Sequence, residues 1–195
     1  MKLWVLRHAP VLLPPGLCYG ASDVPPDEAA TLEAARLASA ALPHGLPVWV
    51  SALGRAGRLA QHLHLQRPDL GPATVDARLN EMNFGSWELR HWDSIPRSAI
   101  DAWTADFDHH RFGGAESTRA VVRRVASALA DLRTGVGDSG QALWITHAGV
   151  IRALRHLAAR GDVPVGEAAR WPADAVPHGT LTSLTFTWPG SVRLP

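Results

Sequence analysis

Short apolar segments alternate with longer helical segments along almost the whole chain, and this alternation restricts the possible folds most. The apolar segments are residues 3–6, VWVSA from Val48, ATVDAR from Ala73, ALWIT from Ala142 and TLTSLTFTW from Thr180. Helical spacing of apolar residues covers 28–42, 54–66, parts of 91–107, a stretch from the expected N-cap Ser117 to about Arg133, and the stretch that begins at Gly149. Strands separated by helices predict an α/β fold with a mostly parallel sheet flanked by helices on both faces.

The composition is typical of one globular domain over residues 1–195. Of the 195 residues 46% are hydrophobic and 19% are charged, so the chain can build a core without a disulfide or metal. Cys18 is the only cysteine, which excludes a disulfide within the chain. A net charge of +1 does not favour nucleic acid as a partner, and no segment is typical of a signal peptide or a membrane span. We therefore expect a cytoplasmic protein without nucleic-acid or membrane partners.

Cationic and imidazole side chains follow the ends of three predicted strands. Arg7 and His8 follow the first strand, Arg55 lies about one helical turn beyond the second, and His147 follows ALWIT. Parallel strands place their carboxyl ends at one edge of the sheet, where open α/β sheets bind ligands. Desolvated cations gathered at one edge repel one another unless an anion lies between them. Because arginine forks match the oxygens of a phosphoryl group two at a time, we expect a small phosphomonoester as the substrate.

The same residue types indicate a mechanism that needs no metal. One neutral histidine can attack phosphorus and form a phosphohistidine that water later hydrolyses, while the second histidine donates to the phosphoryl oxygens. The leaving alcohol then needs a proton donor. Glu81 in the loop RLNEMNFGSWE is the candidate, and a solvated loop carboxylate without a catalytic role is the alternative interpretation of this residue.

Other kinds of chemistry find less support. A cysteine phosphatase would need an arginine six residues after Cys18, where Val24 stands. HLH at 62–64 and DFDHH at 106–110 contain possible metal ligands, but solvated polar segments are the favoured explanation. A protein that binds a phosphorylated ligand without catalysis is the alternative from a different class. Three tryptophans either line a cleft for an aromatic base or pack in the core and at its rim: Trp87, Trp92 and Trp103.

Four segments resemble, in the same order, the motifs of the histidine phosphatase superfamily, the phosphoglycerate-mutase-like proteins. They are LRHA from Leu6, SALGRAGRLA from Ser51, LNEMNFGSWE from Leu79 and THAGVIRAL from Thr146. The resemblance implies that His8 is the phosphohistidine nucleophile, that Arg7, Arg55 and His147 complete the phosphate pocket, and that Glu81 is the proton donor. It implies the α/β fold of the family, with no metal and no organic cofactor. Relatives in this family are often dimers, so a homodimer is a further expectation.

Finer details resemble one branch of the superfamily, the α-ribazole phosphatases, which remove the 5′-phosphate of α-ribazole phosphate or of cobalamin phosphate. CYGASDVP from Cys18 implies that Tyr19 and Gly20 bind the substrate, and EMNFGSWE and GGAES add to the resemblance. Ala9 and Pro10 depart from the family pattern, which bears on substrate preference more than on activity. A histidine phosphatase of another specificity and a phosphoglycerate mutase are the alternatives. The compact chain leaves little to keep water from a phosphohistidine, which favours a phosphatase over a mutase.

Overall fold

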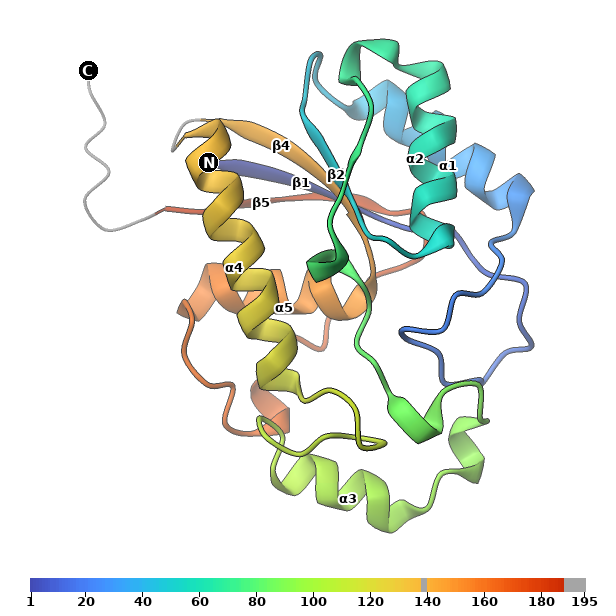
Figure 1. Cartoon of the computed structure of the whole chain (residues 1–195), viewed down its shortest axis with the longest axis vertical. Helices are drawn as coiled ribbons and strands as arrows, with labels where there is room; N and C mark the ends of the chain where they lie inside the picture. The colour runs from blue at the N-terminus through green and yellow to red at the C-terminus, as the bar shows by residue number, and fades with distance from the viewer. Residues whose placement is uncertain (138–139, 188–195) are drawn as a thin grey trace.

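A five-stranded sheet lies at the centre of the computed structural model, which describes residues 1–137 and 140–187 (Figure 1). The strands are β1 (Lys2–Arg7), β2 (Val48–Val50), β3 (Thr74–Val75), β4 (Gln141–Thr146) and β5 (Leu181–Thr185). Their order in the sheet is β3-β2-β4-β1-β5. Every neighbouring pair is parallel except β1 and β5, which are antiparallel. The prediction of a mostly parallel sheet is confirmed.

Helices cover both faces of the sheet. α1 (Glu28–Ala41) and α2 (Gly54–Gln66) pack on one face, and α4 (Thr118–Val136) and α5 (Ala148–Arg160) pack on the other. Successive residues of a strand point to opposite faces, so Trp144 joins the core under α4 and α5 while Ile145 joins the core under α1 and α2. β4 is thus buried on both sides, which explains why its sequence is apolar throughout. Figure 1 shows α3 (Arg97–Ala105) apart from these layers, and none of the helices described combines the length and apolarity of a membrane span.

Most predicted boundaries agree with the structure to within a few residues. The helix predicted over 54–66 is α2 itself, and Ser117 caps α4 as expected. ATVDAR yields a strand of only two residues, because Asp76 caps a short 3-10 helical turn directly after it. The last strand ends at Thr185, and Trp188, the final residue of the predicted strand, lies outside the described residues.

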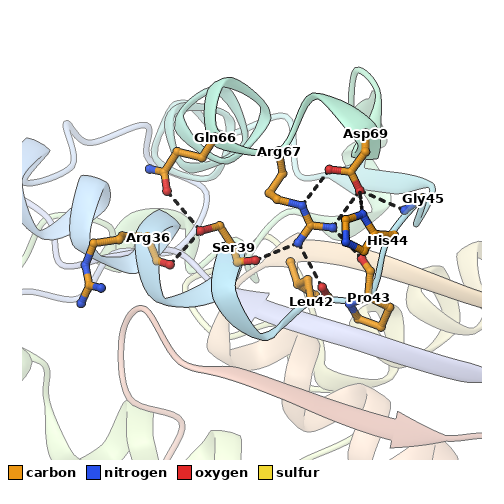
Figure 2. A network of polar contacts seen from close by, with 9 residues as sticks. All are labelled: Arg36, Ser39, Leu42, Pro43, His44, Gly45, Gln66, Arg67 and Asp69. Atoms are coloured by element: carbon orange, nitrogen blue, oxygen red, sulfur yellow. Dashed lines mark hydrogen bonds and ion pairs between the residues drawn. The ribbon is translucent and has the colours of Figure 1, made fainter.

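One arginine joins the C-terminal ends of α1 and α2 (Figure 2). The guanidinium of Arg67, directly after α2, donates to three carbonyl oxygens around the end of α1. They belong to Ser39, Leu42 and Pro43, at 2.7, 3.0 and 2.9 Å. Asp69 pairs with the same guanidinium at 2.7 Å. Because the last carbonyls of a helix have no partner within the helix, this side chain both completes α1 and holds it against α2.

Candidate active site

His8 and His147 lie side by side because the strands that precede them are neighbours. β1 and β4 are parallel, with Arg7 opposite Thr146, and each histidine is the next residue of its chain segment. The two imidazole rings lie 5.0 Å apart, centroid to centroid, and the residues are 1% and 0% exposed. The strand ends therefore meet at one edge, as a parallel sheet requires.

The contacts of His8 fix its tautomer. Its Nδ1 atom lies 2.6 Å from the carbonyl oxygen of Ala9. A carbonyl only accepts, so Nδ1 carries the proton and Nε2 carries the lone pair, without a hydrogen-bond partner in the described part of the chain. Burial lowers the pKa of His8 well below its usual value, and the charges of Arg55 and Arg7 lower it further. The ring is a neutral base whose Nε2 can act as a nucleophile.

His147 holds the opposite tautomer through a relay that the sequence analysis did not find. Asn80 Oδ1 accepts hydrogen bonds from the Ser51 hydroxyl and from the Ala52 N–H, each at 2.8 Å. Because the Ser51 hydroxyl has donated its proton to Asn80, it accepts from His147 Nε2, at 2.8 Å. The proton of the neutral His147 ring therefore lies on Nε2, and Nδ1 carries the lone pair.

The environment of His147 makes Nδ1 sensitive to an anion. This atom is buried and has no hydrogen-bond partner among the residues described. Burial lowers the pKa of His147 well below its usual value, and the nearby His8 and Arg55 lower it further. A bound anion reverses this electrostatic effect, so Nδ1 would gain a proton and donate to the anion.

Arg55 and Arg7 bring positive charge to the site, and neither forms an ion pair with a carboxylate in the part of the chain described. Arg55 is 0% exposed and donates to two carbonyl oxygens of residues 20–22, at 2.6 and 2.8 Å. Arg7 donates to the Val176 carbonyl oxygen and to the ring of His178. The Nε atoms of both arginines are buried and have no hydrogen-bond partner among the residues that the structure describes. Burial lowers the pKa of both side chains. Desolvated guanidiniums without a carboxylate partner form a site for an anion.

His178 is a site residue that the sequence analysis missed. Its ring centroid lies 5.2 Å from that of His8, and its Nε2 lies 2.8 Å from Arg7 Nη2 and 3.3 Å from the Tyr19 hydroxyl. Burial lowers the pKa of His178 to about 4, and the charges of Arg7 and Arg55 contribute. β5 is antiparallel to β1, so its start, rather than its end, reaches the edge where His8 lies. The signal in the sequence is a His-Gly pair directly before the last predicted strand.

Glu81 is held at the N-terminal end of α5. Its carboxylate accepts from the N–H of Gly149, the second residue of that helix, and from the N–H of Met82, both at 2.9 Å. The positive end of the helix dipole favours a carboxylate at this position. A Cβ atom at Gly149 would lie 2.2 Å from Glu81 Oε1, so only glycine permits this approach. Glu81 also lines two cavities, one of about 360 Å³ with Asn80 and one of about 100 Å³ with Trp103.

A second glutamate holds the loop that carries Tyr19 and Gly20. The Glu88 carboxylate accepts from the three backbone N–H groups of residues 20–22, at 2.9 to 3.2 Å. Burial opposes the ionisation of Glu88, but these hydrogen bonds bring its pKa below the usual value. A Cβ atom at Gly20 would lie 1.8 Å from the Met82 carbonyl oxygen. Gly20 thus lets the loop pack closely and uses its own N–H and carbonyl within the protein, whereas Tyr19 presents its hydroxyl to the site.

Residues that the sequence analysis considered for other chemistry have other contacts. Burial raises the pKa of Cys18 to about 12, which disfavours the thiolate that a cysteine phosphatase needs. The Asp108 carboxylate, within DFDHH, accepts from the N–H groups of Val165 and Gly166. Across residues 1–137 and 140–187, no three His, Cys, Asp or Glu side chains are placed to hold one metal ion.

The site can bind and transfer a tetrahedral anion. A nucleophilic nitrogen, two guanidiniums without carboxylate partners and an imidazole that can gain a proton meet at one edge of the sheet, and a carboxyl group at the start of α5 completes the set. A phosphoryl group matches these donors in charge and in the number of its oxygens.

The chain is similar to proteins of one family over most of its length. Residues 3–190 match the family described as histidine phosphatase superfamily (branch 1). The adenosylcobalamin/alpha-ribazole phosphatase of Salmonella typhimurium is 31% identical over 161 residues, which cover 79% of this chain and 77% of that protein. The protein of the same name from Escherichia coli is 30% identical over 160 residues, which cover 79% of this chain and 77% of that protein. The crystal structure of phosphoglycerate mutase from Thermus thermophilus has a TM-score of 0.70 at 27% identity, covering 97% of this chain and 94% of that chain. With the family matched over nearly all of its length, this chain belongs to the histidine phosphatase superfamily.

Proposed function

We propose that the protein is a phosphomonoester hydrolase that forms a phosphohistidine at His8. The observation that carries the proposal is the state of His8. Its Nδ1 is fixed by the Ala9 carbonyl oxygen, its Nε2 has no hydrogen-bond partner in the described part of the chain, and Arg55 and Arg7 lie close enough to lower its pKa. A neutral nucleophile near two guanidiniums that form no ion pair with the described residues suits attack on a dianionic phosphoryl group.

In the first half-reaction, His8 Nε2 attacks phosphorus and the bond from phosphorus to the leaving oxygen breaks. Arg7, Arg55 and the protonated His147 hold the remaining phosphoryl oxygens as charge spreads over them. Glu81 is the group that gives a proton to the leaving oxygen, so that a neutral alcohol departs.

In the second half-reaction, water takes the place of the alcohol. The Glu81 carboxylate takes a proton from the water molecule while the water oxygen attacks phosphorus. The nitrogen–phosphorus bond breaks, the bonding electrons return to His8 Nε2, and inorganic phosphate leaves. The nucleophile, the acid and the stabilising charges are all side chains, so we expect no requirement for a metal or an organic cofactor.

The proposed substrate is α-ribazole 5′-phosphate or the corresponding cobalamin 5′-phosphate. Support comes from the two relatives named adenosylcobalamin/alpha-ribazole phosphatase and from the segments CYGASDVP, EMNFGSWE and GGAES. A phosphoglycerate mutase is the second candidate, because a structure of that name is similar over nearly the whole chain. A mutase must keep water from the phosphohistidine, and the only α-helix described between Glu81 and α4 is α3, which has nine residues.

Two measurements test the proposal. Acid-quenched enzyme, mixed with radiolabelled substrate, should retain phosphate on His8, and His8→Ala should lose both the label and nearly all turnover. Substantial activity in a clean His8→Ala preparation would contradict the mechanism.

A panel of kcat/KM values tests the substrate. It should rank α-ribazole 5′-phosphate above 3-phosphoglycerate, a sugar phosphate and a nucleoside 5′-monophosphate, with no effect of a chelator. A preference on the order of tenfold for another member of the panel would replace the substrate, and dominant mutase activity would replace hydrolysis.

A further inference from the structure

A small aromatic pocket opens beside Glu81. Its volume is about 100 Å³, and Glu81 and Gly149 form the part of its wall that belongs to the active site. Four of the other residues that line it are aromatic: Phe84, Trp103, Phe107 and Trp171. In the proposed mechanism the leaving group lies next to Glu81, and this pocket is one of two cavities that Glu81 lines.

Two residues that line the pocket each carry a buried polar atom without a hydrogen-bond partner in the described part of the chain. Thr118 is 2% exposed, and its Oγ1 atom has no hydrogen bond within residues 1–137 and 140–187. The Trp103 Nε1 atom is also buried and also has no hydrogen bond there. An unsatisfied buried polar group costs about 1–3 kcal/mol. The indole N–H can only donate, while the hydroxyl can donate or accept. Both atoms would be satisfied by a ligand that presents a hydrogen-bond acceptor.

Arg152 connects this pocket to the phosphate site. It lines the pocket from α5 and has no hydrogen bond or ion pair with the residues described. Burial lowers the pKa of Arg7, and the charge of Arg152 is among the nearby charges that lower it further. The pocket therefore lies within electrostatic reach of the guanidinium that holds the phosphoryl group in the proposed mechanism.

The indole of Trp103 is held in place by its neighbours. It stacks with Phe112 at 4.6 Å and 22°, and with Phe107 at 5.5 Å and 25°, measured between ring centroids and ring planes. Stacking of this kind fixes the direction of the Nε1–H bond before a ligand arrives, which reduces the entropy cost of binding.

We infer that this pocket binds a planar nitrogen heterocycle carried by the leaving alcohol of the substrate, with a ring nitrogen accepting from Trp103 Nε1 or Thr118 Oγ1. Aromatic walls favour a planar ring, and the indole N–H and the threonine hydroxyl are neutral donors that suit a neutral acceptor. A cavity of about 150 Å³ holds benzene, so this smaller pocket encloses the nitrogen-bearing edge of the heterocycle. The inference rests on the proposed function, in which Glu81 protonates the leaving oxygen. α-Ribazole fits, since its benzimidazole base has one unsubstituted ring nitrogen.

Two substrates and four variants test this assignment. α-Ribazole 5′-phosphate and ribose 5-phosphate share the phosphoester, but only the first has a base. Thr118→Val removes the hydroxyl with little change in shape, and Trp103→Phe removes the indole N–H together with one ring of the side chain. Each should lower the ratio of the two kcat/KM values about three- to tenfold. Thr118→Ser keeps the hydroxyl and should keep the ratio. Trp92→Phe is the matched control, because Trp92 packs on Phe112 but does not line the pocket.

A second measurement does not depend on the natural phosphoester. α-Ribazole without its phosphate should inhibit hydrolysis of p-nitrophenyl phosphate, and its inhibition constant should rise about three- to tenfold in Thr118→Val and Trp103→Phe. Retained phosphate labelling of His8 shows that the variants are folded. An unchanged ratio and an unchanged inhibition constant in both variants would overturn the pocket assignment.

The same data separate the two proposals. If wild-type enzyme prefers another nucleotide to α-ribazole 5′-phosphate, the proposed substrate is wrong. The pocket assignment is still supported in that case if the variants lower the preference for that nucleotide over ribose 5-phosphate. If no phosphate that carries a base is preferred to ribose 5-phosphate, the pocket assignment is overturned while labelling of His8 still supports the hydrolase.

Discussion

At the scale of single residues, two histidines at equivalent positions of neighbouring strands hold opposite tautomers. The Ala9 carbonyl oxygen places the proton of His8 on Nδ1, and the Ser51 hydroxyl places the proton of His147 on Nε2. Two rings of similar burial thus suit two different roles in the proposed mechanism. One ring can attack phosphorus, and the other can gain a second proton on Nδ1 when an anion arrives.

Ser51→Ala should separate these functions. Without the hydroxyl that accepts from Nε2, the protonated His147 loses a hydrogen-bond acceptor and its pKa in the complex falls. We expect kcat/KM to fall on the order of tenfold or more, and the loss of kcat at high pH to begin at lower pH than in the wild type. The measurement is the pH profile of kcat, with phosphate labelling of His8 as a check of folding.

Ser94→Ala is the matched control for this prediction. The Ser94 hydroxyl is exposed and donates to the carbonyl oxygen of His91, outside the site. The pH profile of kcat for Ser94→Ala should therefore follow that of the wild type. A Ser51→Ala profile that coincides with the wild-type profile would mean that the relay does not set the protonation of His147.

The sequence predicted the groups that directly follow parallel strands better than the groups that orient them. His8 and His147 were predicted to be neighbours because parallel strands align their carboxyl ends, and the structure brings them together. Ser51 and Asn80 were missed because their roles depend on hydrogen bonds between distant segments. No local pattern distinguishes such a serine or asparagine from a turn residue.

At the scale of elements, the N-terminal end of α5 positions the proposed acid. Glu81 comes from a loop, so its place depends on the Gly149 N–H and on the absence of a side chain at Gly149. A helix end of this kind binds a carboxylate through both its free N–H groups and its dipole. The helix thus fixes the proposed acid, a residue that its own sequence does not contain.

Gly149→Ala should therefore damage acid catalysis. The new Cβ would lie 2.2 Å from Glu81 Oε1 and must displace the carboxylate. We expect kcat for an alkyl phosphate to fall on the order of tenfold or more, with a much smaller loss for p-nitrophenyl phosphate, whose leaving group needs no proton. The comparison of the two kcat values is the measurement.

Gly135→Ala controls for the effect of a methyl group on a helix. A Cβ atom at Gly135, in α4, has nothing within 4 Å, so this variant should keep both kcat values and change the free energy of unfolding by no more than about 1 kcal/mol. Equal losses on both substrates in Gly149→Ala would argue that Glu81 is not the acid.

Arg67→Ala should destabilise the α1–α2 layer without changing catalysis. Three carbonyl oxygens lose a charged donor, and the Arg67 side chain is only 13% exposed. We expect the free energy of unfolding in urea to fall by about 2–3 kcal/mol. Arg36→Ala, which removes an exposed pair with Glu33, should change it by less than about 0.5 kcal/mol. Similar values for the two variants would show that the network in Figure 2 adds little to stability.

The elements themselves were largely predictable, because their apolar spacing is local. α2 and β4 follow directly from helical spacing and from an unbroken apolar run. The direction of β5 was not predictable in this way, since an alternating strand can pair in either direction. That direction is what brings His178 to the site, so the missed residue and the unknown strand direction have one cause.

At the scale of the whole molecule, three neighbouring strands each contribute one histidine to the site. β1 lies between β4 and β5, so His8, His147 and His178 meet only when segments from nearly the full length of the chain are folded together. Burial lowers the pKa of all three below the usual value of 6.5, for His178 to about 4. Below pH 6.5 the unfolded chain therefore binds protons that the folded chain does not bind. The free energy of unfolding should fall as the pH drops from 6.5 toward about 4.

An anion in the site should oppose this loss, which provides a test on the intact protein. Sulfate keeps the same charge between about pH 5.5 and 8, and when bound it favours the protonated form of His147. Saturating sulfate should therefore raise the Tm more at about pH 5.5 than at pH 8, because its binding is coupled to proton uptake.

His147→Asn cannot take up that proton, so the Tm shifts of this variant at the two pH values should differ less. His64→Asn, an exposed histidine of α2, should behave like the wild type. Equal Tm shifts at both pH values in the wild type would show that His147 does not gain a proton when the anion binds, and the role of charged donor would then pass to Arg7 and Arg55 alone.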